Sequence, residues 1–245
     1  MSTWRFFACF LVLVLGTGSA WGIPVLQIYV EGATYDTGTE SWVLSDPGGT
    51  VRLWTIGNTD GPGSHGDISN VRLAIAYTSN NGPVNINLTP TTTGGYGGFT
   101  DPSTPSAPTY IQTVTDGSAP VLTDGGDLPN HGIYSMAGVM WQEFSLGDFT
   151  LEDSPVADFI DDFPTSGIRA DSAQINVYEV SVTGADWFHF DLYDSVQSPN
   201  RAVFAPFSHD GETGDGPPVP EPGTIALVGL GLLSVVAARR VRRHS

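Results

Sequence analysis

The stretch DWFHFDLYD, residues 186–194, alternates strictly between two sets of side chains. Three apolar side chains would share one face of an extended chain: Phe188, Phe190 and Leu192. The opposite face would carry the mixed set Trp187, His189, Asp191 and Tyr193. Alternation with a period of two residues predicts a β-strand that rests one face on an apolar core.

The same alternation recurs along the chain between clusters of Gly, Pro, Asn and Asp. It predicts further strands at 25–30, 40–45, 50–57, 71–79, 84–90, 110–115, 135–146, 174–184 and 202–207. No long helical periodicity occurs between residues 21 and 218, although a short helix over Ser154–Phe163 would have Ser154 as its N-cap. Many short strands joined by turns predict an all-β fold, an antiparallel sandwich of two packed sheets.

The N-terminus has the three parts of a signal peptide. Arg5 supplies positive charge, residues 6–15 (FFACFLVLVL) form an apolar core, and small residues end at Ala20, the expected cleavage position. An uncleaved N-terminal anchor is the alternative, but an apolar run of about ten residues is too short to cross a membrane. Cleavage by signal peptidase would also remove Cys9, the one cysteine of the chain, so the mature protein would contain no disulfide.

The C-terminus also has three parts. The triplet Pro220, Glu221 and Pro222 precedes an apolar segment, for which we predict a transmembrane helix over 223–238. A basic cluster follows at once: Arg239, Arg240, Arg242 and Arg243. By the positive-inside rule these arginines would stop transfer and hold the C-terminus in the cytoplasm. An ordinary C-terminal membrane anchor is one interpretation of this tail.

The order of triplet, short apolar helix and arginine cluster over residues 219–243 resembles the PEP-CTERM sorting signal of bacterial exported proteins. This resemblance implies recognition by an exosortase, a membrane transpeptidase, with cleavage near the triplet and transfer to the cell envelope or extracellular matrix. Tails of this kind are sometimes labelled as the C-terminal domain of ice-binding proteins, a label that implies no antifreeze activity. The two prolines would keep the triplet extended, as entry into the cleft of a processing enzyme requires.

We expect four regions: a signal peptide at 1–20, a β-sandwich ectodomain at 21–208, a Gly/Pro linker at 209–218 and the sorting tail at 219–243. Four segments of the ectodomain resemble the choice-of-anchor group of bacterial surface proteins: IYVEGATYD (28–36), VRLWTIGN (51–58), WFHFDLYD (187–194) and FAPFSHD (204–210). That resemblance implies a surface domain without an assigned biochemical role, and it implies no catalytic residues.

The charge balance excludes one class of partner. The chain has 26 acidic side chains against nine basic ones, which gives a formal net charge of −17, and it contains no lysine. The expected mature domain has four arginines: Arg52, Arg72, Arg169 and Arg201. Such a surface repels phosphate backbones, so nucleic acid is not an expected partner.

Three groups of oxygen-bearing side chains would suit Ca²⁺, which prefers carboxylate and carbonyl ligands. They are Asp124, Asp127 and Asn130; Asn58, Asp60 and Asp67; and Glu152, Asp153, Asp158, Asp161 and Asp162. None fits the EF-hand pattern, and solvated turn residues explain all three more simply. We therefore assign no metal ligand and expect no cofactor, with calcium as the alternative.

Aromatic side chains suggest a second function, because rings on a sheet face can stack against sugars. The candidates are Trp42, Trp54, Trp141, Trp187, Tyr77, Tyr178 and Tyr193. Packing in the core or in an ordinary strand is the favoured interpretation of each, and Trp187 is the better candidate for an exposed ring. His189 beside Asp191 is interpreted as a hydrogen-bonded surface pair rather than a catalytic one.

No nucleophile, paired-histidine or zinc motif is present, so we assign no catalytic residue and expect no enzyme. The sequence predicts an exported protein, held transiently in the inner membrane and then in the envelope or matrix, with a structural or interaction role. A carbohydrate-binding module that uses Trp187 or Trp42, with polysaccharide as partner and calcium for stability, is the alternative. A secreted hydrolase with paired carboxylates is the third interpretation.

Overall fold

The computed structural model describes the strands of the ectodomain and the segments next to them. The described residues are 25–36, 41–44, 50–60, 64, 66–79, 82–91, 107–122, 125–128, 133–156, 169–185, 187–194 and 211–213. Every regular element in these ranges is a β-strand, which confirms the all-β prediction for this part of the chain. None of these ranges contains a helix long and apolar enough to cross a membrane. The predicted signal peptide, the strand at 202–207 and the helix at 223–238 lie outside them.

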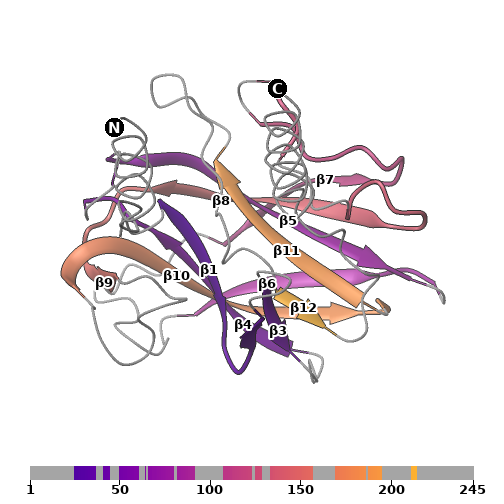
Figure 1. The fold of residues 1–245 in the computed structure, drawn as a ribbon, viewed down its shortest axis with the longest axis horizontal. Coiled ribbons are helices and arrows are strands. Elements are labelled where there is room, and N and C mark those ends of the chain that lie inside the picture. Colours follow the sequence, from indigo (N-terminus) through magenta and orange to yellow (C-terminus); the bar gives the residue numbers. More distant parts are fainter. Residues whose placement is uncertain are drawn as a thin grey trace, which may run out of the picture.

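The first sheet has five antiparallel strands. Four run in the order β1 (Leu26–Val30), β4 (Thr50–Gly57), β10 (Arg169–Thr183) and β6 (Asn85–Thr91), and β9 (Ser154–Val156) pairs along the first part of β10. β10 is the long curved ribbon of Figure 1, and its pairing changes along its length from β9 to β4 and β6.

The second sheet has four antiparallel strands. Their order is β11 (Trp187–Asp194), β5 (Ile68–Thr78), β8 (Met140–Phe149) and β7 (Thr109–Val114). β5 and β8 lie at the centre of this sheet, and β7 is an edge strand. Figure 1 shows this sheet as a second layer beside β1, β4 and β10.

A small third sheet contains β2 (Thr34–Asp36), β3 (Ser41–Leu44) and β12 (Gly211–Thr213). β12 pairs with β3 in parallel, which is an exception to the antiparallel pattern predicted from the sequence. Residues 211–213 fall within the stretch predicted as a polar linker, and here they add a strand to the folded domain.

The main core lies between the two large sheets. Gly57 is paired with Leu26, and a Cβ built at Gly57 would lie 2.5 Å from Phe149 and 3.0 Å from Ile68 of the second sheet. This face of the first sheet therefore packs directly on the second. The predicted inward set from β11, Phe188, Phe190 and Leu192, is 1–6% exposed and belongs to this core, as expected. Each such side chain contributes about 1.5–3 kcal/mol by leaving water.

The other face of the second sheet is also covered. Trp187 and Tyr193, on the face of β11 opposite the main core, are 2% and 0% exposed and belong to a second apolar cluster. Its cover comes from the described residues of the segment 115–139, which we call the covering segment. The prediction that only one face of this strand is buried is therefore wrong.

Two local predictions differ from the structure. Ser154–Val156, expected to begin a short helix, forms strand β9 instead, because Ser154 is buried and pairs with Ala173 of β10. The strand predicted at 135–146 begins only at Met140. The residues before it turn, with Gly138 at a φ of 84°, so that they can join the covering segment.

Two glycines with the same backbone conformation allow the packing to be tested. Gly184 and Gly147 both have a φ of 84°, but only at Gly184 would a Cβ meet backbone, 2.5 Å from the Pro83 carbonyl oxygen. Gly147→Ala should therefore cost about 1–2 kcal/mol of unfolding free energy, from backbone strain alone. Gly184→Ala should cost about 1–3 kcal/mol more, because the chain at Pro83 has to move. Denaturant unfolding of both variants measures the difference, and equal losses would contradict this packing.

Candidate functional site

The outer face of the second sheet, under the covering segment, holds a group of connected charged side chains. At its centre is Glu143 of β8, whose carboxylate is 1% exposed. A buried carboxylate is costly unless hydrogen-bond donors surround it. The donors around Glu143 therefore determine whether this part of the sheet is stable.

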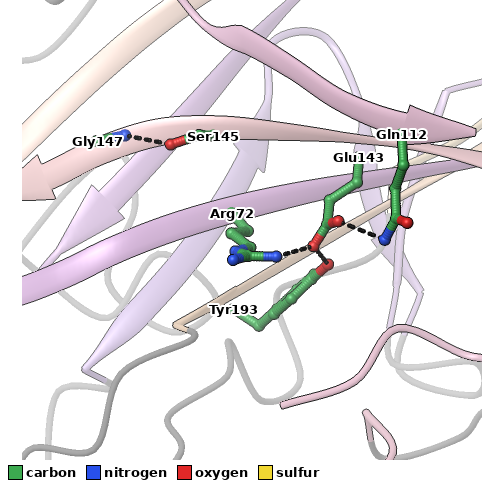
Figure 2. A network of polar contacts seen from close by, with 6 residues as sticks. All are labelled: Arg72, Gln112, Glu143, Ser145, Gly147 and Tyr193. Atoms are coloured by element: carbon green, nitrogen blue, oxygen red, sulfur yellow. Dashed lines mark hydrogen bonds and ion pairs between the residues drawn. The ribbon is translucent and has the colours of Figure 1, made fainter. Parts of the chain in front are cut away.

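Three donors reach Glu143, and each comes from a different one of the other strands of the sheet (Figure 2). The Arg72 guanidinium of β5 donates to Oε1 at 2.8 Å, and the Tyr193 hydroxyl of β11 donates to the same oxygen at 2.7 Å. The Gln112 amide of β7 donates to Oε2 at 2.7 Å. One side chain thus connects all the strands of this sheet.

Strand register explains why these residues meet. Asp191 pairs with Ala74, Ala74 pairs with Glu143, and Glu143 pairs with Gln112, so one row crosses the whole sheet. Tyr193 pairs with Arg72 two positions away on the same face. The methyl group of Ala74 is small enough to let long side chains from both sides extend over β5. Neighbouring strands are about 4.8 Å apart, which places the Cα atoms of Asp191 and Glu143 about 10 Å apart.

Asp191 forms a second polar centre on this face. The Tyr134 hydroxyl from the covering segment donates a short hydrogen bond to Asp191 Oδ2. His189 Nε2 lies 3.2 Å from the same oxygen, and the Trp187 ring stacks on His189 with centroids 5.9 Å apart. The Tyr134 bond fixes the covering segment to the sheet, together with the Trp141 indole N–H, which donates to the Ser118 carbonyl at 2.8 Å.

Burial keeps the phenol of Tyr193 protonated. Loss of solvent raises its pKa well above 10.0, and the negative charge of Glu143 and the hydrogen bond donated to it raise the pKa further. The negative charge of Asp191 also raises the pKa of Tyr193, whereas the positive charge of Arg72 lowers it. Because the hydroxyl stays protonated, it remains a donor to Glu143 at every physiological pH.

This arrangement is suited to holding strands together. Both oxygens of Glu143 already accept hydrogen bonds from the chain itself. A general base needs a free lone pair within reach of a substrate proton. The outer face is covered and its carboxylates are almost fully buried, so the contacts described here connect parts of the protein to each other.

The tryptophans and tyrosines selected from the sequence are all buried. Trp187 is 2% exposed and Trp42 is 6% exposed, which agrees with the favoured packing interpretation and contradicts the alternative in which either ring is exposed to a sugar. The covering segment and the stacked ring of His189 account for its burial. The core interpretation is confirmed for the remaining candidates, which are 0–4% exposed: Trp54, Trp141, Tyr77, Tyr178 and Tyr193.

His189 and Asp191 are adjacent, as predicted, but they do not lie on the surface. Their exposures are 0% and 2%. The alternation of β11 placed both residues on one face correctly. It gave no sign that residues some 50 positions earlier in the chain cover that face.

The acidic groups considered for calcium are only partly described. Asn58 is buried whereas Asp60, Asp67 and Asp127 are exposed, and Glu152 is exposed beside half-buried Asp153. The remaining members lie outside the described residues: Asp124, Asn130, Asp158, Asp161 and Asp162. No group of three or more potential ligands comes together in the part of the chain that the structure describes.

Sequence reasoning missed Glu143, Arg72, Gln112 and Tyr134 as a connected set. One signal was available, because Arg72 interrupts an apolar strand and is one of only four arginines expected in the mature domain. A charged side chain at such a position predicts a buried partner. Nothing in the local sequence identifies Glu143 as that partner, since 71 positions separate the two residues.

The residues assigned to sorting lie outside the described part of the chain: Ala20, Pro220, Glu221, Pro222, Arg239, Arg240, Arg242 and Arg243. Comparison with known families identifies the C-terminal group. Residues 218–243 match the family model of the PEP-CTERM protein-sorting motif. The chain carries a PEP-CTERM sorting signal. This signal marks an exported protein for exosortase-dependent sorting to the cell envelope or the extracellular space.

Comparisons of the whole chain are less informative. No curated protein sequence matches it. The N-terminal domain of the Streptococcus gordonii adhesin Sgo0707 is 9% identical, with a TM-score of 0.28, over 78% of this chain and 32% of the adhesin domain. AvmM, which catalyses macrocyclization in alchivemycin A biosynthesis, is 8% identical, with a TM-score of 0.26, over 79% of this chain and 91% of its own. The chain thus spans about a third of the adhesin domain, and neither likeness supports a functional argument.

Removing the charge of Glu143 should destabilise the protein strongly. In Glu143→Gln an amide NH₂ replaces one of the oxygens that accept bonds from Arg72, Tyr193 and Gln112. We expect a loss of about 2–4 kcal/mol, because at least one buried donor loses its acceptor. Glu179→Gln, at an exposed position of β10, is the matched control and should stay within about 0.5 kcal/mol of the native protein. Equal unfolding free energies for the two variants would rule out this role.

Alkaline pH should also destabilise the fold. In the unfolded chain Tyr193 ionises near its ordinary pKa of 10.0, whereas the folded protein holds that pKa well above this value. Between the two values the unfolded state loses a proton that the folded state keeps, so the unfolding free energy falls as pH rises above about 10. Burial raises the pKa of Tyr178 in the same way.

The contribution of Tyr193 to this loss of stability at alkaline pH can be measured separately. Tyr193→Phe cannot ionise, so its unfolding free energy should fall less steeply with pH above about 10 than that of the native protein. Tyr110→Phe removes a hydroxyl from a side chain that is 55% exposed and should keep the native slope. Denaturant unfolding between about pH 9 and pH 11.5 gives both slopes. A native slope in Tyr193→Phe would show that its ionisation does not affect stability.

Proposed function

We propose that this protein is a structural or interaction component of the cell envelope or extracellular matrix, processed by an exosortase through its PEP-CTERM tail. The observation that carries this proposal is the sorting motif at residues 218–243. The choice-of-anchor resemblance of the ectodomain agrees with a surface role. The motif residues are the substrate of the sorting reaction and catalyse nothing themselves.

The proposed order of events follows from the two ends of the chain. Signal peptidase removes residues 1–20, and the helix at 223–238 holds the protein transiently in the inner membrane. Arg239, Arg240, Arg242 and Arg243 stop transfer on the cytoplasmic side. The triplet at 220–222 then meets the exosortase at the outer boundary of that membrane.

The position of β12 limits how far the domain extends from the membrane at this stage. β12 ends at Thr213, where it pairs with Leu44 of β3. Only residues 214–219 separate Thr213 from Pro220, and fully extended they span at most about 25 Å. The folded domain would therefore lie close to the membrane surface while the triplet is processed.

We assign the ectodomain no catalytic role. Two observations support this: both oxygens of the buried Glu143 accept hydrogen bonds from its own chain, and Asp191 accepts a hydrogen bond from Tyr134 of the covering segment. These are the carboxylates that strand register brings to one face of the sheet. A carboxylate pair for hydrolysis would require that face to open to a substrate.

The intact mass of the protein recovered from the envelope and culture medium of its native host tests the proposal. We expect loss of residues 1–20 and of the segment after the triplet, with or without an added group. A full-length C-terminus retained in the inner membrane would instead indicate an ordinary anchored protein.

Two proline variants sharpen this test. The double variant Pro220→Ala/Pro222→Ala should accumulate with its tail uncleaved, because the triplet is no longer held extended. Pro217→Ala changes a proline outside the matched residues and should be processed normally. Equal processing of the two variants would show that the triplet is not what the enzyme recognises.

A further inference from the structure

Strand β7 forms one edge of the second sheet and is the most exposed strand of that sheet. Its six residues, Thr109–Val114 (TYIQTV), pair with β8 alone among the described residues. The first five are exposed and Val114 is half-buried. Figure 1 shows β7 at the upper right of the molecule. The backbone N–H and C=O groups on the outer side of β7 therefore meet no strand in the part of the chain that the structure describes.

The exposed large apolar side chains of the described ranges all belong to this strand or to the covering segment that follows it. They are Tyr110 at 55% exposure, Ile111 at 39% and Val121 at 57%. The Tyr110 ring packs edge-to-face on Phe144, with centroids 6.0 Å apart, and its hydroxyl lies 3.0 Å from Thr113 Oγ1. These contacts hold the tyrosine in place while more than half of it stays exposed, so exposed apolar surface and unpaired strand edge occur together.

The other described edges are protected in ways that β7 is not. Proteins usually protect an edge strand with charge, proline, short length or a covering element. Edge strand β6 contains Pro90, which has no N–H for a further ladder, and β2 has only three residues, one of them Asp36. β11, at the opposite edge of the second sheet, lies against β12. β7 contains neither a charged residue nor a proline.

A bulge interrupts β7 without closing its edge. The register with β8 shifts between Tyr110 and Gln112, so Ile111 has no partner on β8. The strand pairs with β8 through Tyr110 before the bulge and through Gln112 to Val114 after it. The Gln112 amide also donates to Glu143 on the covered face, which fixes β7 to the sheet. The edge is therefore a firmly held strand.

We propose that β7 is a self-association surface, to which β7 of a second copy of this chain adds as an antiparallel strand. The contact is isologous, so the same six residues supply both of its sides. Backbone hydrogen bonds join the two second sheets into one continuous sheet. The exposed side chains of Tyr110 and Ile111 pack across the junction and lose contact with water.

The absence of charge in β7 favours a second copy as the occupant. The chain has a net charge of −17, so two copies repel each other over most of their surfaces. In an antiparallel β7 pair no charged side chain of the strand faces another, and aromatic and β-branched side chains meet instead, a favourable cross-strand combination. A basic partner would find no carboxylate on this strand. A lipid surface would cover the apolar side chains but leave the outer backbone groups without hydrogen bonds.

A contact of this size is weak. Six residues of strand span about 20 Å, and two such strands bury less surface than the about 1,200–2,000 Å² of a stable complex. Association therefore depends on protein concentration. Attachment of many copies to one envelope surface raises their effective concentration, and only this step rests on the proposed function.

Hydrogen exchange of the full-length protein in mild detergent tests the pairing. Dilute and concentrated samples are compared at one fixed detergent concentration. We expect the backbone amides of residues 109–114 to exchange about tenfold more slowly in the concentrated sample, because pairing protects them. The amides of edge strand β6, residues 85–91, should exchange equally in both samples. Exchange in β7 that does not depend on protein concentration would overturn the proposal, whether the strand is open or is covered by detergent.

Two charged variants locate the contact. Ile111→Glu places one carboxylate in each copy close to the two-fold axis, so sedimentation should show association weakened about tenfold. Asn87→Glu adds the same charge at an exposed position of edge strand β6 and should associate like the native protein. Equal association of the two variants would overturn the assignment to β7.

The two measurements separate pairing of β7 from other effects. Both variants keep the same C-terminal tail, so association through the apolar tail would occur equally in both. Ile111→Glu should keep the native thermal unfolding midpoint, because Ile111 is exposed, and the exchange measurement uses the native chain and needs no variant to fold. Self-association is measured on purified protein, so its failure and a failure of exosortase processing are seen in different experiments.

Discussion

The second sheet depends on one buried carboxylate. Glu143 lies in a central strand, and its donors come from the three other strands of that sheet. Without these donors a negative charge would remain in a region closed to water, at a cost that no single apolar contact offsets. The same centre fixes the orientation of Tyr193, and with it the face of β11 that meets the covering segment.

The covering segment gives the domain its second core. The Tyr134 hydroxyl donates a hydrogen bond to Asp191, and the Trp141 indole N–H donates one to the carbonyl of Ser118. Polar contacts therefore fix the covering segment to the sheet at two points. Between those points, apolar side chains shield Ala74, Ala76 and Trp187. The face of β5, β8 and β11 that would otherwise meet solvent is therefore buried as well, which adds apolar burial in a chain whose single cysteine allows no internal disulfide.

The sequence by itself determined the features that depend on neighbouring residues. Alternation in β11 placed Phe188, Phe190 and Leu192 on the core face, and the order of triplet, apolar segment and arginines identified the sorting tail. Only the tertiary structure decided which faces are covered, because cover comes from residues far away in the chain. His189 and Asp191 were expected as a surface pair and are buried, and Glu143 pairs with Arg72, 71 positions away in the chain. Local periodicity reports which side chains share a face, and it carries no information on what packs against that face.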